Sequence, residues 1–119
     1  MSYTNIILIA IIVVFFAMRM MPVKGIKNIT TAELKNLLKE KNKQFIDVRT
    51  PAEYKSRHIR EFVNMPLHQL PEKATQLSKE KETIVICQSG MRSARASKQL
   101  KKMGFKNIIN VKGGMSAWN

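Results

Sequence analysis

Residues 83–93 have the sequence TIVICQSGMRS, and this stretch decides which fold and which chemistry are expected of the chain. Its first four residues are β-branched and lie between polar residues, a pattern that predicts a short buried strand. Small or apolar residues then recur at spacings of three and four from Ser93 to Met103, which predicts one face of a helix. Cys87, the single cysteine of the chain, therefore lies where a buried strand ends and a helix follows.

The loop between that strand and that helix is suited to hold a negatively charged sulfur. Gly90 permits backbone angles that other residues rarely adopt, so the turn can be tight. Backbone N–H groups of such a turn, together with the first N–H groups of the helix, point at a common centre and favour negative charge there. A thiol at that centre ionises easily, and the thiolate is the nucleophile. We therefore predict that Cys87 is a nucleophile; the alternative is an inert buried cysteine.

Short strands alternate with helices along the rest of the chain. Strands are expected over residues 26–29, 45–48, 62–65, 84–87 and 108–111, and helices are expected to begin near Thr30, Pro51, Pro71 and Met91. This alternation predicts an α/β domain with about five mostly parallel strands and helices on both faces of the sheet. Ligands of such sheets bind at the carboxyl ends of the strands, where Cys87 and the segment 47–49 both lie.

The N-terminal segment has a different character from the rest. The first 18 residues contain no Lys, Arg, Asp or Glu, and residues 6–18 are an unbroken apolar run. As a helix, residues 2–21 would extend roughly 30 Å, about the thickness of the hydrocarbon core of a bilayer. We therefore predict one transmembrane helix that contacts membrane lipid through residues 2–21, ended by Pro22. Residues 1–25 are expected to form this anchor and a short juxtamembrane link.

The residues that flank the apolar run predict its orientation. Arg19, Lys24 and Lys27 follow the run and no cation precedes it, so we expect a single-pass protein of the cell membrane whose domain faces the cytoplasm. One unpaired cysteine fits that reducing compartment. A cleaved signal peptide is an alternative, but no basic segment precedes the run and residues 16–19 make a poor cleavage site. A buried amphipathic element is a further alternative, although the run has no polar face.

The net charge of +13 is unevenly distributed along the chain. From Thr83 to Asn119 there are seven cations and no acidic residue, which favours a thiolate at Cys87 and attracts anions. Three of these cations, Lys98, Lys101 and Lys102, are more simply explained as the solvent face of a helix. Attraction to an anionic lipid surface is a third possible use. No nucleic-acid partner is expected, because no aromatic residues are interleaved with the cations.

Four ordered motifs make residues 26–119 resemble the rhodanese-like (sulfurtransferase) family. The motifs are DVRTPAEY at residues 47–54, HI and NMP at 58–59 and 64–66, CQSGMRS at 87–93, and GGMSAW at 113–118. The resemblance implies the rhodanese-like fold and sulfur transfer through a persulfide on Cys87. It also implies that no metal or organic cofactor takes part. The chain differs from many relatives at Arg57 and Glu61, where glycines are common, and at Gln88, where arginine is common, so one cation is missing from the rim of the loop.

The residues of the loop have expected roles in this chemistry. The Cys87 thiolate would attack the outer sulfur of a donor and form a covalent intermediate, from which a thiol, a protein or cyanide then takes the sulfur. The loop residues that would bind the donor and stabilise the sulfur are Gln88, Ser89, Gly90, Met91, Arg92 and Ser93. Arg92 would hold a small anionic donor such as thiosulfate.

Other polar residues are assigned supporting or structural roles. Asp47, Arg49 and Glu53 are expected to form a structural network beneath the site. His58 and His68 are expected to be structural rather than catalytic, and with Cys87 they show no spacing typical of metal ligands.

Two further functions compete with sulfur transfer. A cysteine-dependent phosphatase or arsenate reductase uses the same electrostatic device, but its loop has five residues between cysteine and arginine, whereas four separate Cys87 from Arg92 here. A smaller loop suits a sulfur atom better than a tetrahedral phosphate. The other candidate is a non-catalytic docking or sensing module that has kept its cysteine.

Overall fold

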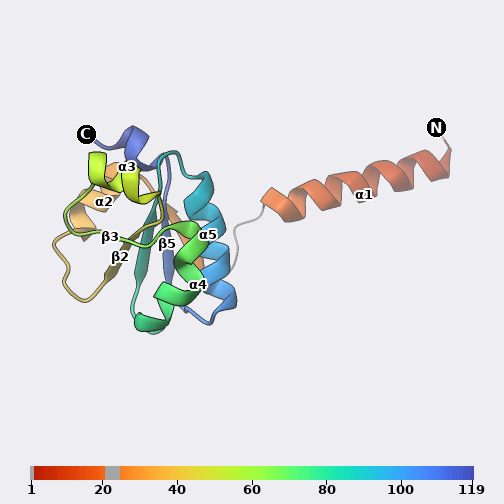
Figure 1. The fold of residues 1–119 in the computed structure, drawn as a ribbon. Coiled ribbons are helices and arrows are strands. Elements are labelled where there is room, and N and C mark those ends of the chain that lie inside the picture. Colours follow the sequence, from red (N-terminus) through yellow and green to blue (C-terminus); the bar gives the residue numbers. More distant parts are fainter. Residues whose placement is uncertain (1, 21–24) are drawn as a thin grey trace.

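The computed structural model of this chain describes residues 2–20 and 25–119 (Figure 1). From Ile26 onward the chain forms an α/β domain around one five-stranded sheet. The strands are β1 (Ile26–Ile29), β2 (Gln44–Asp47), β3 (Val63–Asn64), β4 (Thr83–Ile86) and β5 (Ile108–Val111). They lie in the order β1-β5-β4-β2-β3, and each neighbouring pair is parallel. The predicted α/β domain with a five-stranded parallel sheet is therefore confirmed.

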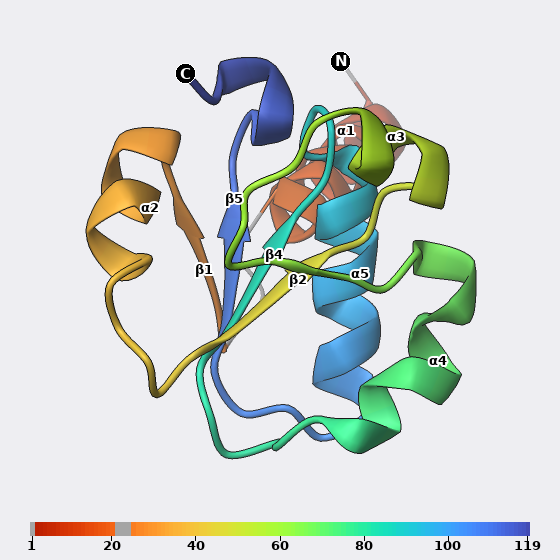
Figure 2. The same ribbon diagram turned by 60° about the vertical axis from the view of Figure 1, so that its left-hand side comes forward.

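Helices cover both faces of this sheet, as predicted. The helices of the domain are α2 (Thr31–Leu37), α3 (Pro51–Ser56), α4 (Leu70–Lys73) and α5 (Met91–Lys102), and short 3-10 turns span Leu67–Gln69, Ala74–Gln76 and Gly114–Ala117. Figure 2 shows α2 on one side of the sheet and α4 with α5 on the other. Parallel strands joined by helices that return across the sheet produce this layered arrangement.

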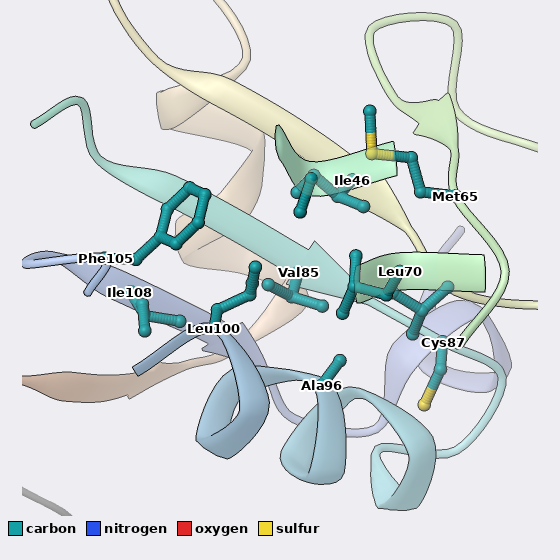
Figure 3. Close-up of a cluster of buried hydrophobic side chains, with 11 residues drawn as sticks. Ile46, Met65, Leu70, Val85, Cys87, Ala96, Leu100, Phe105 and Ile108 are labelled. Carbon is teal, nitrogen blue, oxygen red and sulfur yellow. The ribbon is translucent and has the colours of Figure 1, made fainter. Parts of the chain in front are cut away.

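The strand β4 lies in the middle of the sheet and is buried on both faces. All four of its residues are buried, as expected for a central parallel strand. Its side chains alternate between two apolar clusters: Ile84 and Ile86 join the cluster on the α2 side, and Val85 joins the cluster under α4 and α5. Figure 3 shows the second cluster, with Cys87 at its edge beside α5. The core therefore fixes the position from which the Cys87 loop departs.

Capping boxes start two of the helices. Thr30 accepts a hydrogen bond from the backbone N–H of Glu33, and the Glu33 carboxylate accepts one in return from the backbone of Thr30, as predicted. Thr50 and Glu53 form the same arrangement at the start of α3, where Pro51 occupies the first turn. This second box, which the sequence analysis did not identify, fixes the Glu53 side chain at the start of α3.

Several elements differ from their predicted extents. The strands expected over residues 45–48 and 62–65 cover Gln44–Asp47 and Val63–Asn64. The strand expected over residues 84–87 covers the β-branched run Thr83–Ile86, because the Cys87 carbonyl accepts a hydrogen bond from Met115 N–H (2.8 Å) instead of continuing the sheet. The helix expected near Pro71 is one α-helical turn between two 3-10 turns. Pro71 fits in the first turn of a helix but offers no N–H to an earlier carbonyl, which favours short turns here.

The predicted transmembrane helix is not supported. The segment does contain a helix, α1 (Tyr3–Met20), with exposed apolar side chains. However, within residues 2–20 and 25–119 no helix is both long enough and apolar enough to span a bilayer. The 18 residues of α1 extend about 27 Å, less than the roughly 30 Å of the hydrocarbon core. The predicted helix end at Pro22 and most of the predicted link lie outside the described residues.

Candidate active site

Cys87 lies directly after β4, at the carboxyl edge of the sheet, and its side chain is buried. The 3-10 turn at Gly114–Ala117 packs against the first two residues of the loop. Besides the Met115 contact, Ser116 N–H donates to the Gln88 carbonyl oxygen (2.9 Å). A Cβ atom at Gly114 would lie 2.2 Å from the Cys87 carbonyl oxygen, so a glycine is required for this close approach. The closing motif of the sequence therefore supports the Cys87 loop directly.

Hydrogen-bond donors surround the sulfur atom. Gly90 N–H donates to Cys87 Sγ at 3.0 Å, and the backbone at Gly90 is left-handed, with φ of 105°. Burial by itself raises the pKa of the Cys87 thiol. Hydrogen bonds from the Ser93 hydroxyl and from the backbone N–H groups of Ser93, Gly90 and Ser89 oppose it and leave the pKa below its ordinary value. The geometry therefore favours the thiolate, which is the reactive form.

Ser93 has two hydrogen-bond partners at the start of α5. Its hydroxyl oxygen lies 3.3 Å from Cys87 Sγ, and the hydroxyl donates to the Gly90 carbonyl oxygen (3.1 Å). In this arrangement the protonated Cys87 thiol donates to Ser93. When the thiol ionises, the hydroxyl can rotate and donate to the sulfur instead. Ser93 is therefore able to serve both protonation states of Cys87.

Asp47 and Arg49 form a buried ion pair beneath the loop. The Arg49 guanidinium donates to the Asp47 carboxylate, with Nη2 to Oδ2 at 2.9 Å, and to the Arg57 carbonyl oxygen. The same guanidinium also donates from Nη1 to Gln88 Oε1 (3.3 Å). Since Gln88 Nε2 donates to Ser116 Oγ, this side chain joins the ion pair to the turn that follows β5.

Arg92 is paired with a carboxylate. Its Nη1 and Nη2 donate to Oε1 and Oε2 of Glu53 at 2.6 and 2.9 Å, which is a two-pronged ion pair between α5 and α3. Hydrogen bonding with Arg92 lowers the pKa of Glu53 to about 2. Burial opposes this shift, and hydrogen bonds from Thr50 assist it. The hydrogen bond with Glu53 raises the pKa of Arg92. Glu53 thus belongs to a second ion pair, separate from the Asp47–Arg49 pair with which it was grouped in the sequence analysis.

The remaining residues of the predicted site lie around this centre. Ser89 and Met91 are exposed, while Gln88 is half-buried. His58 stacks on Tyr54, with ring centroids 3.9 Å apart, and its Nδ1 lies 2.8 Å from the Tyr54 carbonyl oxygen, which fits the structural role predicted for it. Among residues 2–20 and 25–119, no three His, Cys, Asp or Glu side chains are grouped so that they could hold a metal ion.

This architecture agrees with comparisons to known proteins. A family model described as Rhodanese-like domain matches residues 30–119. The chain belongs to the rhodanese-like family. The putative sulfurtransferase YtwF of Bacillus subtilis is 43% identical over 94 residues, which cover 78% of this chain and 90% of that protein. A sulfurtransferase of Allochromatium vinosum is 33% identical over 73 residues, or 61% of this chain and 68% of that protein.

A solved structure shows the same fold. The crystal structure of a rhodanese-like domain protein from Staphylococcus aureus superimposes with a TM-score of 0.72 at 37% identity and covers 78% of this chain and 91% of that one. The resemblance identified from the four sequence motifs is thus confirmed for the rhodanese-like domain.

Two clefts flank the active-site loop of this rhodanese-like domain. The first, about 380 Å³, is lined by Val48, Thr50, Pro66, Leu67, His68 and Arg92. The second, about 240 Å³, is lined by Arg49, Glu53, Ser56, Arg57, Gln88 and Met115. The ion pair between Arg92 and Glu53 contributes one residue to each cleft.

Sequence reasoning missed three contributors to the site. Gly114 and Ser116 were identified as part of a family motif but not as contacts of the Cys87 loop. The repeated Gly-Gly at residues 113–114 was the available signal, because paired glycines often mark a close backbone approach. The pairing of Arg92 with Glu53 had no signal in the sequence, since the two residues are 39 positions apart.

Proposed function

We propose that this chain is a rhodanese-type sulfurtransferase that carries sulfane sulfur as a persulfide on Cys87. The observation that carries the proposal is the environment of Cys87 Sγ, which lies 3.0 Å from Gly90 N–H in a loop that lowers the pKa of the thiol. Membership of the rhodanese-like family and the similarity to two proteins named as sulfurtransferases support it.

In the first half-reaction, the Cys87 thiolate attacks the outer sulfur of the donor. With thiosulfate, the bond between the two sulfur atoms breaks, sulfite leaves with the bonding electron pair, and Cys87 becomes a persulfide anion. The N–H groups at the start of α5 stabilise the charge on the terminal sulfur. No external oxidant or reductant is needed, because the sulfur atom moves in the same oxidation state.

In the second half-reaction, an acceptor attacks the terminal sulfur of the persulfide. Cyanide leaves as thiocyanate, or a small or protein thiolate leaves as a new persulfide, and the Cys87 thiolate is restored. When the Cys87 thiolate is restored, the Ser93 hydroxyl, whose oxygen lies 3.3 Å from Sγ, can rotate away from the Gly90 carbonyl oxygen and donate to the sulfur. Splitting the transfer into two displacements avoids a direct encounter of donor and acceptor.

Access to the sulfur requires a local opening of the loop. The Cys87 side chain has no exposed surface, whereas Ser89 and Met91 on the outer side of the loop are exposed. A donor therefore reaches Sγ when residues 88–91 move outward. Loop segments with exposed backbone open at low free-energy cost compared with the core.

A turnover assay tests the proposal against its rivals. The full chain is incubated with thiosulfate and cyanide, and thiocyanate is measured for the wild type and for Cys87→Ala. We expect steady thiocyanate release from the wild type and release at background level from the variant. Hydrolysis of an aryl phosphate would instead indicate a cysteine-dependent phosphatase. Absence of both activities would favour a docking module.

We also propose that the domain works in the cytoplasm. The chain has a single cysteine, which the mechanism needs in its reduced form. A reporter that is active only in the cytoplasm, fused after Asn119, is expected to be active. Activity of only a reporter specific for an oxidising compartment would contradict this location.

A further inference from the structure

Two arginines at the site are matched with a carboxylate, while a third, Arg57, donates to the Trp118 carbonyl oxygen. Arg49 is paired with Asp47 in the buried ion pair, and Arg92, the single cation of residues 88–93, is paired with Glu53. The neutral Gln88 accepts a hydrogen bond from Arg49 and adds no charge of its own. The positive charge of Arg49 and Arg92, which was expected to attract an anionic donor, is therefore largely compensated beside the loop.

The Glu53 carboxylate is held in place by its own helix as well as by Arg92. Its Oε1 accepts hydrogen bonds from the backbone N–H and the hydroxyl of Thr50, each at 3.0 Å, as part of the capping box of α3. Because the capping box already orders the Glu53 side chain, the ion pair with Arg92 costs little further conformational entropy. An anion that bound Arg92 through the same two N–H groups would have to displace this carboxylate.

The ion pair of Arg92 and Glu53 lies where a donor would approach the loop. Arg92 lines the first cleft together with the apolar side chains of Val48, Pro66 and Leu67. Arg92 belongs to the Cys87 loop, and Val48 packs in the same apolar cluster as Cys87, so this cleft borders the loop that holds the reactive sulfur. The side chains of Glu53 and Arg92 are about one-third exposed, at 32% and 35%, and a solute in the cleft meets a neutralised cation beside apolar surface.

We propose that Glu53 is a donor-selectivity residue. It occupies the Arg92 N–H groups that would bind the sulfonate of thiosulfate, and so directs the site toward organic persulfides that carry less negative charge. This inference rests on the proposed sulfur-transfer function. The uncharged carbon skeleton of such a donor lies against Val48, Pro66 and Leu67, while its outer sulfur meets Cys87.

The chemical step with such a donor is balanced without a further reactant. The Cys87 thiolate attacks the outer sulfur of R–S–SH, and the bond between the two donor sulfurs breaks. The leaving group R–S⁻ takes the bonding electron pair, and the proton stays on the sulfur now attached to Cys87. The leaving thiolate carries one negative charge, in contrast to the sulfite dianion released by thiosulfate.

The test compares two donors on the full chain. Sulfur loading of Cys87 is followed by mass with thiosulfate and with the persulfide of N-acetylcysteine amide, whose carbon skeleton is uncharged, and KM and the maximal rate are measured separately. Glu53→Gln removes the charge but keeps a side chain that serves in a capping box. We expect KM for thiosulfate to fall about fivefold in this variant, while the kinetics with the organic persulfide change by less than about twofold.

Two further variants make the test specific. Glu80→Gln makes the same change in net charge at the exposed Glu80–Lys106 pair, and we expect it to leave the ratio of the two donors unchanged. In the double variant Glu53→Gln with Arg92→Gln, the gain with thiosulfate should disappear, because the freed guanidinium is its source. Circular dichroism at the assay temperature shows whether each variant is folded.

Several outcomes would overturn the inference. If wild type accepts sulfur and Glu53→Gln changes both donors equally, or neither, Glu53 is a structural residue only. If the gain with thiosulfate persists without Arg92, the charge acts through some other route and the inference also fails. If the wild type gains sulfur from neither donor, the proposed function itself is wrong, which distinguishes the two failures.

Discussion

At the scale of single residues, the ionisation of the Cys87 thiol depends on the hydrogen bonds to its Sγ. Ser93→Ala removes one donor to the thiolate, and burial then opposes ionisation with less compensation. Because a higher pKa leaves less thiolate at neutral pH, we expect the alkylation rate of Cys87 at pH 7 to fall severalfold and its pH midpoint to move upward. Ser97→Ala is the matched control: Ser97 is also buried in α5 but donates to the Ser93 carbonyl. Equal effects of the two variants would contradict this role of Ser93.

Gly114 gives a second prediction at this scale. The added Cβ of Gly114→Ala would lie 2.2 Å from the Cys87 carbonyl oxygen, and φ at this position is +54°. We expect a loss of about 2–3 kcal/mol in unfolding free energy, measured in urea, together with slower sulfur loading. Gly104→Ala is the control, since its φ is +100° but its Cβ would meet only the Lys79 side chain, at 3.6 Å. A larger loss at Gly104 would contradict the close-approach argument.

At the scale of elements, the junction between α3 and α5 predicts how stability depends on pH. The pKa of Glu53 is about 2 in the folded domain and 4.5 ordinarily, so its ion pair stabilises the fold above about pH 4.5 and loses this effect as the pH falls toward 2. Because both side chains are partly exposed and solvent screens the pair, its contribution to the free energy of unfolding is about 1 kcal/mol. Urea unfolding should show Glu53→Gln less stable than wild type at pH 7, with the difference shrinking at pH 3. A difference that does not change with pH would refute this.

The elements also show how far sequence reasoning reached. Local signals predicted them well: β1 and β5 were predicted at their observed bounds, and the Thr30 capping box was predicted from four residues. Predictions were weaker where distant contacts decide the outcome. Cys87 leaves the sheet because of a partner 28 residues later, and Arg92 turns to Glu53 39 residues earlier. No pattern of apolar spacing encodes such pairings, so only the structure shows that Arg92 is paired with Glu53.

At the scale of the whole molecule, the two apolar clusters predict an autonomous domain. Their buried members lie between Ile29 and Met115, and among the side chains that the structure describes none of these members belongs to α1. We expect a fragment of residues 25–119 to unfold cooperatively at the same temperature as the full chain, within a few degrees, and to load sulfur at the same rate. Thermal unfolding followed by circular dichroism checks the first point. An unfolded fragment would contradict the predicted boundary near residue 26.

A measurement of intact mass shows whether Cys87 carries a sulfur atom. The full chain is incubated with a sulfane-sulfur donor, desalted and weighed, alongside Cys87→Ala. We expect the wild type to gain the mass of one sulfur atom, cyanide to remove it, and the variant to gain nothing. A wild-type chain that keeps its original mass with both thiosulfate and the organic persulfide, or a variant that gains sulfur equally well, would contradict this role of Cys87.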